Sequence, residues 1–259
     1  MPQPAIVLDR VSLRYRISTE PVRSLKEFVI RRIRRNLLMR DHWALRDVSL
    51  EVHAGEVVGI IGRNGVGKTT LLKVVARVLW PTQGRVIVRG VVAPLLGLGA
   101  GFHDELTGRE NVSLSWATLG RPVAEAEARF EAIKEFSGLG EFIEAPLRTY
   151  SSGMRARLGF AVATDVEPDI LLLDEILSVG DAEFRKKSNE RIQSFQQTGA
   201  TVLLVSHGMS TIRQLCNRAI LLDAGRIVAK GDPEEVIAAY ERLGELPAPD
   251  RAAASPAGT

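Results

Sequence analysis

The N-terminal third of the chain alternates between hydrophobic and polar positions. Segments 5–17, 44–52 and 84–90 show the period of two that is typical of strands with one buried face, so we expect an antiparallel layer there. Farther along, 168–175 and 200–207 are continuous apolar runs. Such runs are typical of parallel strands that are buried on both faces of a sheet.

Between those two runs, residues 182–197 carry a helical pattern and complete a β-α-β unit. A second helical region, from about residue 104 to 160, predicts a helical subdomain. Near the C-terminus, a hairpin that turns at 223–225 precedes a helix that Asp232 caps. The sequence therefore predicts an α/β fold with a mostly parallel sheet, an N-terminal antiparallel β subdomain and an α-helical subdomain.

An insert at residues 18–43 separates the first two predicted strands. Ser24 and Glu27 form a capping box for a helix, whose apolar stripe consists of Leu25, Val29, Ile33 and Leu37. The other faces of this helix are basic, with Arg23, Lys26, Arg31, Arg32, Arg34, Arg35 and Arg40. Two interpretations remain open: a solvated face over a packed stripe, or a surface that meets anionic lipid headgroups or a membrane partner. A nucleic-acid patch is a weaker third interpretation.

The composition limits the compartment and the partners. The 259 residues carry a formal net charge of only +3, which argues weakly about partners. Cys216 is the single cysteine, which excludes an intramolecular disulfide, and the N-terminus lacks the basic start and apolar core of a secretory signal. Apolar runs are short or broken, whereas a membrane-spanning helix needs about 20 apolar residues. We expect one cytosolic domain at 1–245 that does not cross a membrane, and a disordered tail at 246–259.

One glycine-rich motif predicts a phosphate site. Gly62, Gly67, Lys68 and Thr69 match the P-loop pattern G-x-x-x-x-G-K-[ST], between an apolar strand and a helix start. The glycines let backbone N–H groups approach phosphate oxygens, Lys68 reaches the β and γ phosphates, and the Thr69 hydroxyl binds Mg²⁺. The residues expected to bind ATP here are Gly62, Arg63, Asn64, Gly65, Val66, Gly67, Lys68, Thr69 and Thr70.

Polar residues at the ends of the two buried strands complete the predicted catalytic site. Asp174 is expected to hold Mg²⁺, and Glu175, which points the other way, to polarise a water that attacks the γ phosphate. His207 follows the next buried strand, from where it could donate to the γ phosphate. No metal-ligand spacing joins the remaining histidines.

The stretch "TYSSGMRARLGF", 149–160, places Ser151, Ser152 and Gly153 at the start of a helix. Either serine can cap that helix, and the same helix end can bind an anion. Since the P-loop already occupies one side of the phosphates, a second anion loop would be most useful from another subunit.

These motifs, in this order, resemble those of the ATP-binding-cassette ATPases. The resemblance implies that Ser151 and Gly153 contact phosphate from a signature motif, and that the loop 178–181, with Asp181, links two nucleotide sites. It also implies that Tyr15 stacks on adenine, with Trp43 as a possible substitute. One departure is the lack of any glutamine between residues 83 and 193, and "LGLGAGF" is expected to take over the contact that the family's glutamine makes.

Within that family, the stretches "GLGAGFHDELTGRENV" and "DEILSVGDAEFRKKS" resemble the ATPase subunits of polysaccharide and polyol-phosphate exporters. That branch implies a homodimer at the cytoplasmic face of the inner membrane, integral membrane permease subunits as partners, and a lipid-linked glycan such as O-antigen as cargo. No nucleic acid is expected in this interpretation. The alternative is a soluble ATPase of the same superfamily that acts on nucleic acid or ribosomes. A regulator that does not hydrolyse ATP conflicts with Glu175 and His207.

Overall fold

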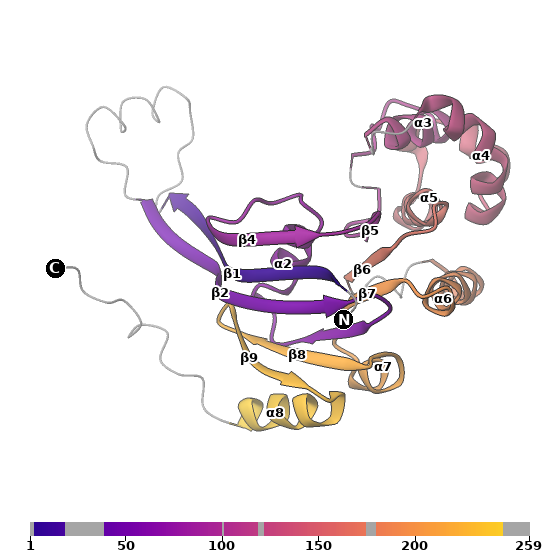
Figure 1. The fold of residues 1–259 in the computed structure, drawn as a ribbon. Helices are drawn as coiled ribbons and strands as arrows, with labels where there is room; N and C mark the ends of the chain where they lie inside the picture. Colours follow the sequence, from indigo (N-terminus) through magenta and orange to yellow (C-terminus); the bar gives the residue numbers. More distant parts are fainter. Residues whose placement is uncertain (1–2, 19–38, 100, 119–121, 175–179, 246–259) are drawn as a thin grey trace, which may run out of the picture.

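The structure is a computed structural model, and it describes residues 3–18, 39–99, 101–118, 122–174 and 180–245. Two sheets lie side by side, and a group of helices projects from one end of the larger sheet (Figure 1). Among the described residues, no helix has the length and apolar character needed to span a bilayer.

The smaller sheet is the antiparallel layer that the alternating pattern predicts. It has three strands in the order β2-β1-β4, with β1 at Pro4–Ser18, β2 at Met39–His53 and β4 at Gln83–Val88. Both pairings of β1 are antiparallel, and β1 pairs with β2 through several register shifts.

The larger sheet has the order β5-β6-β7-β3-β8-β9. The strands are β3 (Val57–Ile61), β5 (Val92–Leu95), β6 (Ile170–Asp174), β7 (Thr201–Val205), β8 (Arg218–Asp223) and β9 (Arg226–Gly231). All pairings are parallel except that of β8 with β9, which is the predicted hairpin. The carboxyl ends of β3, β6 and β7 therefore meet at one edge of the sheet.

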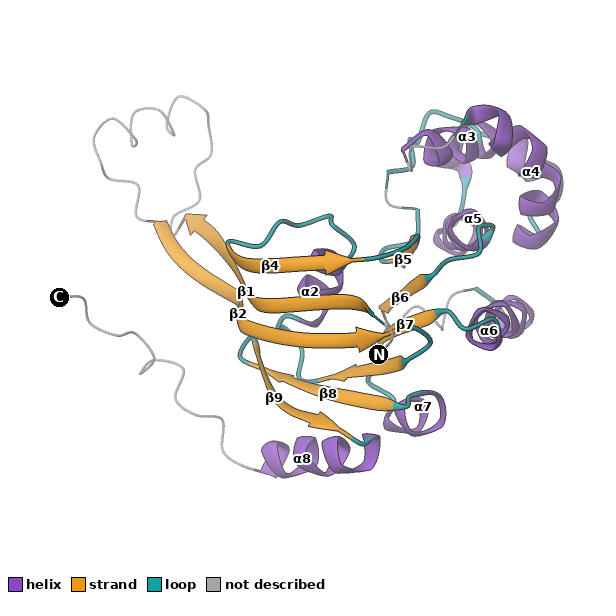
Figure 2. Ribbon diagram, viewed as in Figure 1, coloured by secondary structure: helices purple, strands orange, loops and turns teal. Residues whose placement is uncertain are grey.

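Helices follow these strands along the chain (Figure 2). They are α2 (Lys68–Val75), α3 (Gly108–Thr118), α4 (Val123–Ser137), α5 (Ser152–Thr164), α6 (Ala182–Gln197), α7 (Met209–Leu215) and α8 (Pro233–Glu245). Two 3-10 helices, η1 (Gly140–Glu144) and η2 (Leu147–Thr149), connect α4 to α5. The helices α3, α4 and α5 form the predicted helical subdomain, although α5 extends four residues beyond the predicted end at residue 160.

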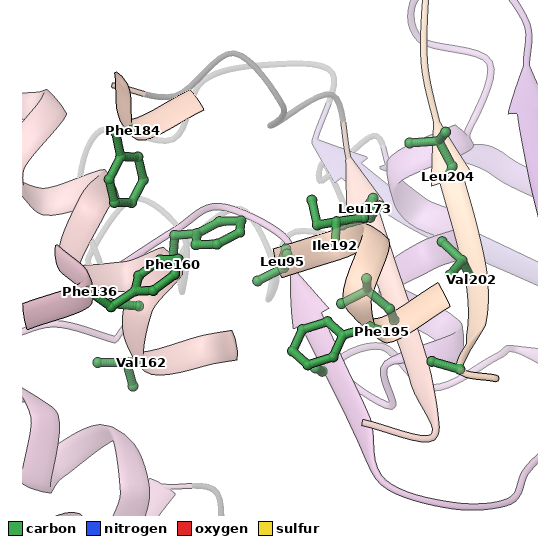
Figure 3. Packing of buried hydrophobic residues seen from close by; sticks show 14 of the residues in the cluster. Leu95, Phe136, Phe160, Val162, Leu173, Phe184, Ile192, Phe195, Val202 and Leu204 are labelled. Carbon is green, nitrogen blue, oxygen red and sulfur yellow. The ribbon is translucent and has the colours of Figure 1, made fainter. Parts of the chain in front are cut away.

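Each strand of the larger sheet divides its side chains between two cores. In β6, Leu171 and Leu173 belong to the core that includes helices α3, α4, α5 and α6. Ile170 and Leu172 belong to the core that includes α2 and the antiparallel sheet. Side chains alternate across a strand, so a continuous apolar run is what a sheet covered on both faces requires. Figure 3 shows the first core, where rings from α4, α5 and α6 meet near the sheet.

Three features differ from the prediction. The sequence places Ser18 and 39–43 in the insert, but Ser18 ends β1 and residues 39–43 begin β2, so Arg40 lies in a strand and not on the predicted helix. Residues 19–38, where the basic helix is predicted, lie outside the described residues. The strand β5 was missed because Pro94 interrupts a short apolar run, yet an edge strand tolerates proline. The short helix α7 was also missed.

Candidate functional site

The P-loop backbone has the conformations that require glycine. Gly62 and Gly67 have φ values of 151° and 109°. A Cβ atom on Gly62 would lie 2.3 Å from the Leu222 carbonyl oxygen, and one on Gly67 would lie 2.4 Å from the Ala44 carbonyl oxygen. Because both obstacles are backbone atoms, a side chain at either position would displace the loop.

The first turn of α2 is open to an anion. Gly67 is its N-cap residue and supplies no side-chain hydrogen bond, so the first N–H groups of the helix keep their capacity to bind phosphate. Lys68, which is 7% exposed, donates from Nζ to the carbonyl oxygens of Gly62 at 2.7 Å and Arg63 at 3.0 Å. The ammonium group therefore lies inside the loop, where phosphate oxygens could replace these acceptors.

Lys68, Asp174 and His207 come together at the carboxyl edge of the larger sheet. Asp174 is the last residue of β6 and pairs with Val205 at the end of β7, two residues before His207. Burial lowers the pKa of Lys68, and the Asp174 carboxylate opposes that shift. Burial and the charge of Lys68 lower the pKa of His207, again against Asp174. The structure thus brings these three side chains together, and the lowered pKa of His207 favours a neutral imidazole at neutral pH.

The oxygen atoms at this edge suit magnesium. Thr69 is exposed next to Lys68 in the first turn of α2, and Asp174 is partly exposed at the end of β6. A hydroxyl and a carboxylate are the hard oxygen ligands that Mg²⁺ takes together with phosphate oxygens. Glu175, the predicted base, lies outside the described residues.

The remaining P-loop side chains surround the same opening. Arg63, Asn64 and Gly65 are exposed, whereas Val66 and Thr70 are partly buried. The Val66 carbonyl oxygen accepts a hydrogen bond from the Gly225 N–H at 3.1 Å, so the β8–β9 turn holds the P-loop. The sequence showed this turn but gave no sign of its contact with the loop.

The faces of β1 and β2 distinguish the two candidates for adenine stacking. Leu13 pairs with Leu45, which contacts the Cβ position of Gly67, and Tyr15 lies two residues farther on the same face of β1. Trp43 pairs with Arg14 on the opposite face and lies against the Arg14 guanidinium, 5.4 Å from ring centre to Cζ. Tyr15, which is 36% exposed, therefore fits the predicted role better than Trp43.

The signature segment lies apart from the P-loop of its own chain. Ser151 is the N-cap residue of α5, and its Oγ accepts a hydrogen bond from Met154 N at 3.2 Å. Figure 1 shows α5 among the projecting helices, well separated from α2. Gly153, in the first turn, has room for a Cβ, which would make only an ordinary contact with Ser151 Oγ at 3.8 Å. The structure thus confirms the cap, and it does not bring Ser151 to the P-loop within one chain.

Asp181 joins two helices, and none of its contacts among the described residues is with the P-loop. It caps α6, with Oδ1 accepting from Phe184 N at 2.9 Å, and its Oδ2 lies 3.6 Å from Arg157 Nη1 in α5. Rings of Phe136, Phe160 and Phe184 pack beside this pair, with each pair of ring centres 5.9 Å apart. Asp181, at the start of α6, is therefore tied to the signature helix α5 by an ion pair and by packed rings.

The glycine-rich loop after β5 packs against α5. Gly97, Gly99 and Gly101 all have positive φ, at 66°, 80° and 91°. A Cβ on Gly159 would lie 2.5 Å from Gly99 N and 2.9 Å from the Leu98 carbonyl carbon, which shows how closely the helix approaches the loop. Alternating left-handed glycines give this loop a shape that other residues adopt only with strain.

Comparisons with known proteins agree with this geometry. The chain is 49% identical over 203 residues to the O-antigen export system ATP-binding protein RfbB of Klebsiella pneumoniae, covering 78% of this chain and 82% of the relative. It is 45% identical over 204 residues to the teichoic acids export ATP-binding protein TagH of Lactococcus lactis, but spans only 44% of that longer protein.

Solved structures show the same fold. An ATP-binding subunit of an ABC transporter superposes with a TM-score of 0.70 at 23% identity, covering 92% of this chain and 93% of the other. A dimeric, post-hydrolysis ATP-binding cassette with bound ADP and phosphate superposes with a TM-score of 0.68 at 22% identity, covering 88% and 98%. Residues 45–178 match the model of the ABC transporter family, and with the P-loop, Asp174 and His207 gathered at one sheet edge, the chain belongs to that family of ATPases.

Proposed function

We propose that this protein is the ATP-hydrolysing motor subunit of an exporter that moves a lipid-linked polysaccharide, such as an O-antigen-like glycan, across the inner membrane. The observation that carries this proposal is the joint presence of an ATPase site and 44–49% identity to relatives named for O-antigen export. Both relatives are from Klebsiella pneumoniae, and the one that is 44% identical over 242 residues is covered over 98% of its length.

The proposal gives each side chain of the site a role in ATP hydrolysis. Lys68 leaves its carbonyl acceptors for the β and γ phosphates, and the open first turn of α2 donates N–H groups to them. Thr69 and Asp174 hold Mg²⁺, which neutralises phosphate charge when bound. Glu175 polarises the attacking water, and His207, neutral at pH 7, donates to the γ phosphate.

The dimer is part of the proposal. Since Ser151 and Gly153 do not reach the P-loop of their own chain, they contact the ATP held by a second copy of the protein. A homodimer then encloses two ATP molecules, and the link between Asp181 and Arg157 connects the two sites.

The partners in the membrane are integral permease subunits, with the ATPase bound peripherally at the cytoplasmic face. The loop 96–102 is proposed to replace the family's glutamine as the contact with the permease, because Gly99 in it packs on Gly159 of α5, the helix that begins at Ser151. Gly101 has a φ of 91°, which proline cannot adopt, so Gly101→Pro is expected to uncouple transport from ATP hydrolysis. Membrane contact of the basic segment 18–43 stays a prediction.

Deletion of the gene in the source organism tests the proposal. Surface polysaccharide is expected to disappear, and lipid-linked glycan to accumulate inside the cell. The parent gene and the Lys230→Ala variant, which alters an exposed lysine of β9, are expected to restore export, whereas Lys68→Ala is not. Normal surface polysaccharide in the deletion strain, or co-purification of the protein with ribosomes or DNA instead of a membrane subunit, would favour the soluble alternative.

A further inference from the structure

A groove of about 740 Å³ lies on the antiparallel sheet, and no residue of the P-loop lines it. Its walls come from β1, β2, β4 and β9, which contribute the arginines Arg10, Arg46, Arg85 and Arg226, together with Trp43. Residues far apart in sequence thus bring four guanidinium groups to one concave surface.

The groove opens on the face opposite α2. Val11 and Leu13 are buried in the core that contains α2, whereas Ser12, between them, lines the groove. Because successive side chains point to opposite faces of a strand, the groove and the helix lie on opposite sides of the sheet. The groove is therefore separate from the ATP site, which lies at the start of α2.

Positive charge dominates this surface. Four arginines line the groove against two aspartates, Asp9 and Asp47. Arg10 forms an exposed ion pair with Asp9 at 3.4 Å, and the other three arginines form no ion pair with any residue that the structure describes. Their charge is available to a ligand.

Arg46 is the most constrained of these arginines. Its backbone N–H donates to the Gly225 carbonyl oxygen at 2.8 Å, and its side chain is partly buried. Its Nε atom is buried, and no described residue accepts a hydrogen bond from it. An unpaired buried donor is costly, so Arg46 gains if a ligand draws its side chain toward the groove, where the guanidinium can donate to it.

The strands themselves create the concave shape. Arg10, Asp47 and Gly84 have positive φ values of 47°, 52° and 86°. Ser12 Oγ accepts a hydrogen bond from Asp47 N at 2.9 Å, and a Cβ on Gly84 would lie 2.3 Å from the Arg10 carbonyl oxygen. The surface is thus formed by irregular backbone that hydrogen bonds and close contacts hold in place.

We propose that this groove is a second anion site, which binds a small ligand with a diphosphate group. Guanidinium groups form paired, charge-assisted hydrogen bonds with phosphate oxygens, and their planar fork matches that geometry. The groove volume lies in the range of small-molecule sites. Trp43 supplies an apolar wall for the remainder of the ligand. This inference does not depend on the proposed transport function.

The test measures pyrophosphate binding to the full chain by isothermal titration calorimetry. Saturating adenylyl imidodiphosphate with Mg²⁺ first occupies the ATP site. Pyrophosphate is then expected to bind saturably, and Arg85→Glu and Arg226→Glu are each expected to weaken binding about tenfold or more. The matched control is Lys230→Glu, which makes the same charge change at an exposed position of β9 outside the groove, and it is expected to keep the parent affinity.

Competition identifies the organic part of the ligand. Displacement of pyrophosphate by ADP indicates a nucleotide, and displacement by UDP-glucose but not ADP indicates a sugar-linked diphosphate. Circular dichroism and thermal melting confirm that each variant is folded. The proposal is overturned by no binding to the loaded chain, by equal loss in Lys230→Glu, or by failure of both competitors.

Discussion

Replacing Ser151 with aspartate separates the two roles of the start of α5, which are capping of the helix and the proposed contact with phosphate. Ser151 is exposed, and its Oγ caps α5 through Met154 N at 3.2 Å. Aspartate is as good an N-cap as serine, and its charge interacts favourably with the helix dipole, so Ser151→Asp is expected to change the free energy of unfolding by less than about 1 kcal/mol. Ser151→Ala instead loses the cap, which costs about 1 kcal/mol and lowers Tm by about 2–4 °C.

The same aspartate is expected to prevent dimerisation. In the proposed dimer, Ser151 faces the γ phosphate of ATP held by the second copy. A carboxylate about 4 Å from one phosphate charge, at an effective dielectric constant of about 20, is repelled by about 4 kcal/mol. That energy corresponds to roughly a thousandfold weaker association for each contact.

Sedimentation velocity with adenylyl imidodiphosphate and Mg²⁺ measures the dimer, and thermal unfolding of the same samples measures stability. Ser151→Asp is expected to be monomeric, as stable as the parent protein and able to bind nucleotide. Ser151→Ala is the matched control, with lower stability and a smaller loss of dimer. A stable Ser151→Asp protein that dimerises like the parent would refute the reasoning, because α5 would then not face a phosphate of the partner.

Two further predictions concern packing and titration. Gly159→Ala places a Cβ within 2.5 Å of Gly99 N, so it is expected to be about 1–3 kcal/mol less stable in urea unfolding than Gly153→Ala, which meets no atom closer than 3.8 Å. Equal stabilities would contradict the close approach of α5 to the loop. Burial raises the pKa of the Cys216 thiol from 9.0 to about 12. The contribution of this thiol to stability is therefore expected to be complete below pH 9.0 and to be lost as the pH rises from 9.0 to about 12. Ellman's reagent at about pH 8 should therefore label Cys216 only on unfolding; rapid labelling of native protein would contradict its burial.

Local sequence patterns determined most elements. The apolar runs that became β6 and β7 predict strands because a sheet covered on both faces needs apolar side chains at every position. Asp232 as a cap is confirmed by its Oδ1, which accepts from Glu234 N at 2.9 Å. The P-loop was also predictable, because its glycines and Lys68 act through backbone geometry within a few residues.

Only the tertiary structure decided how separate segments meet. Asp174 and His207 reach Lys68 because β6, β7 and β3 are parallel neighbours, a strand order that no local pattern contains. The resemblance favours Tyr15 for adenine stacking, with Trp43 as a substitute, and only the register of β1 and β2 shows that the two lie on opposite faces. Sequence periodicity shows that a residue is buried or exposed, but it does not show which segment lies opposite, since that depends on pairings between residues far apart in the chain.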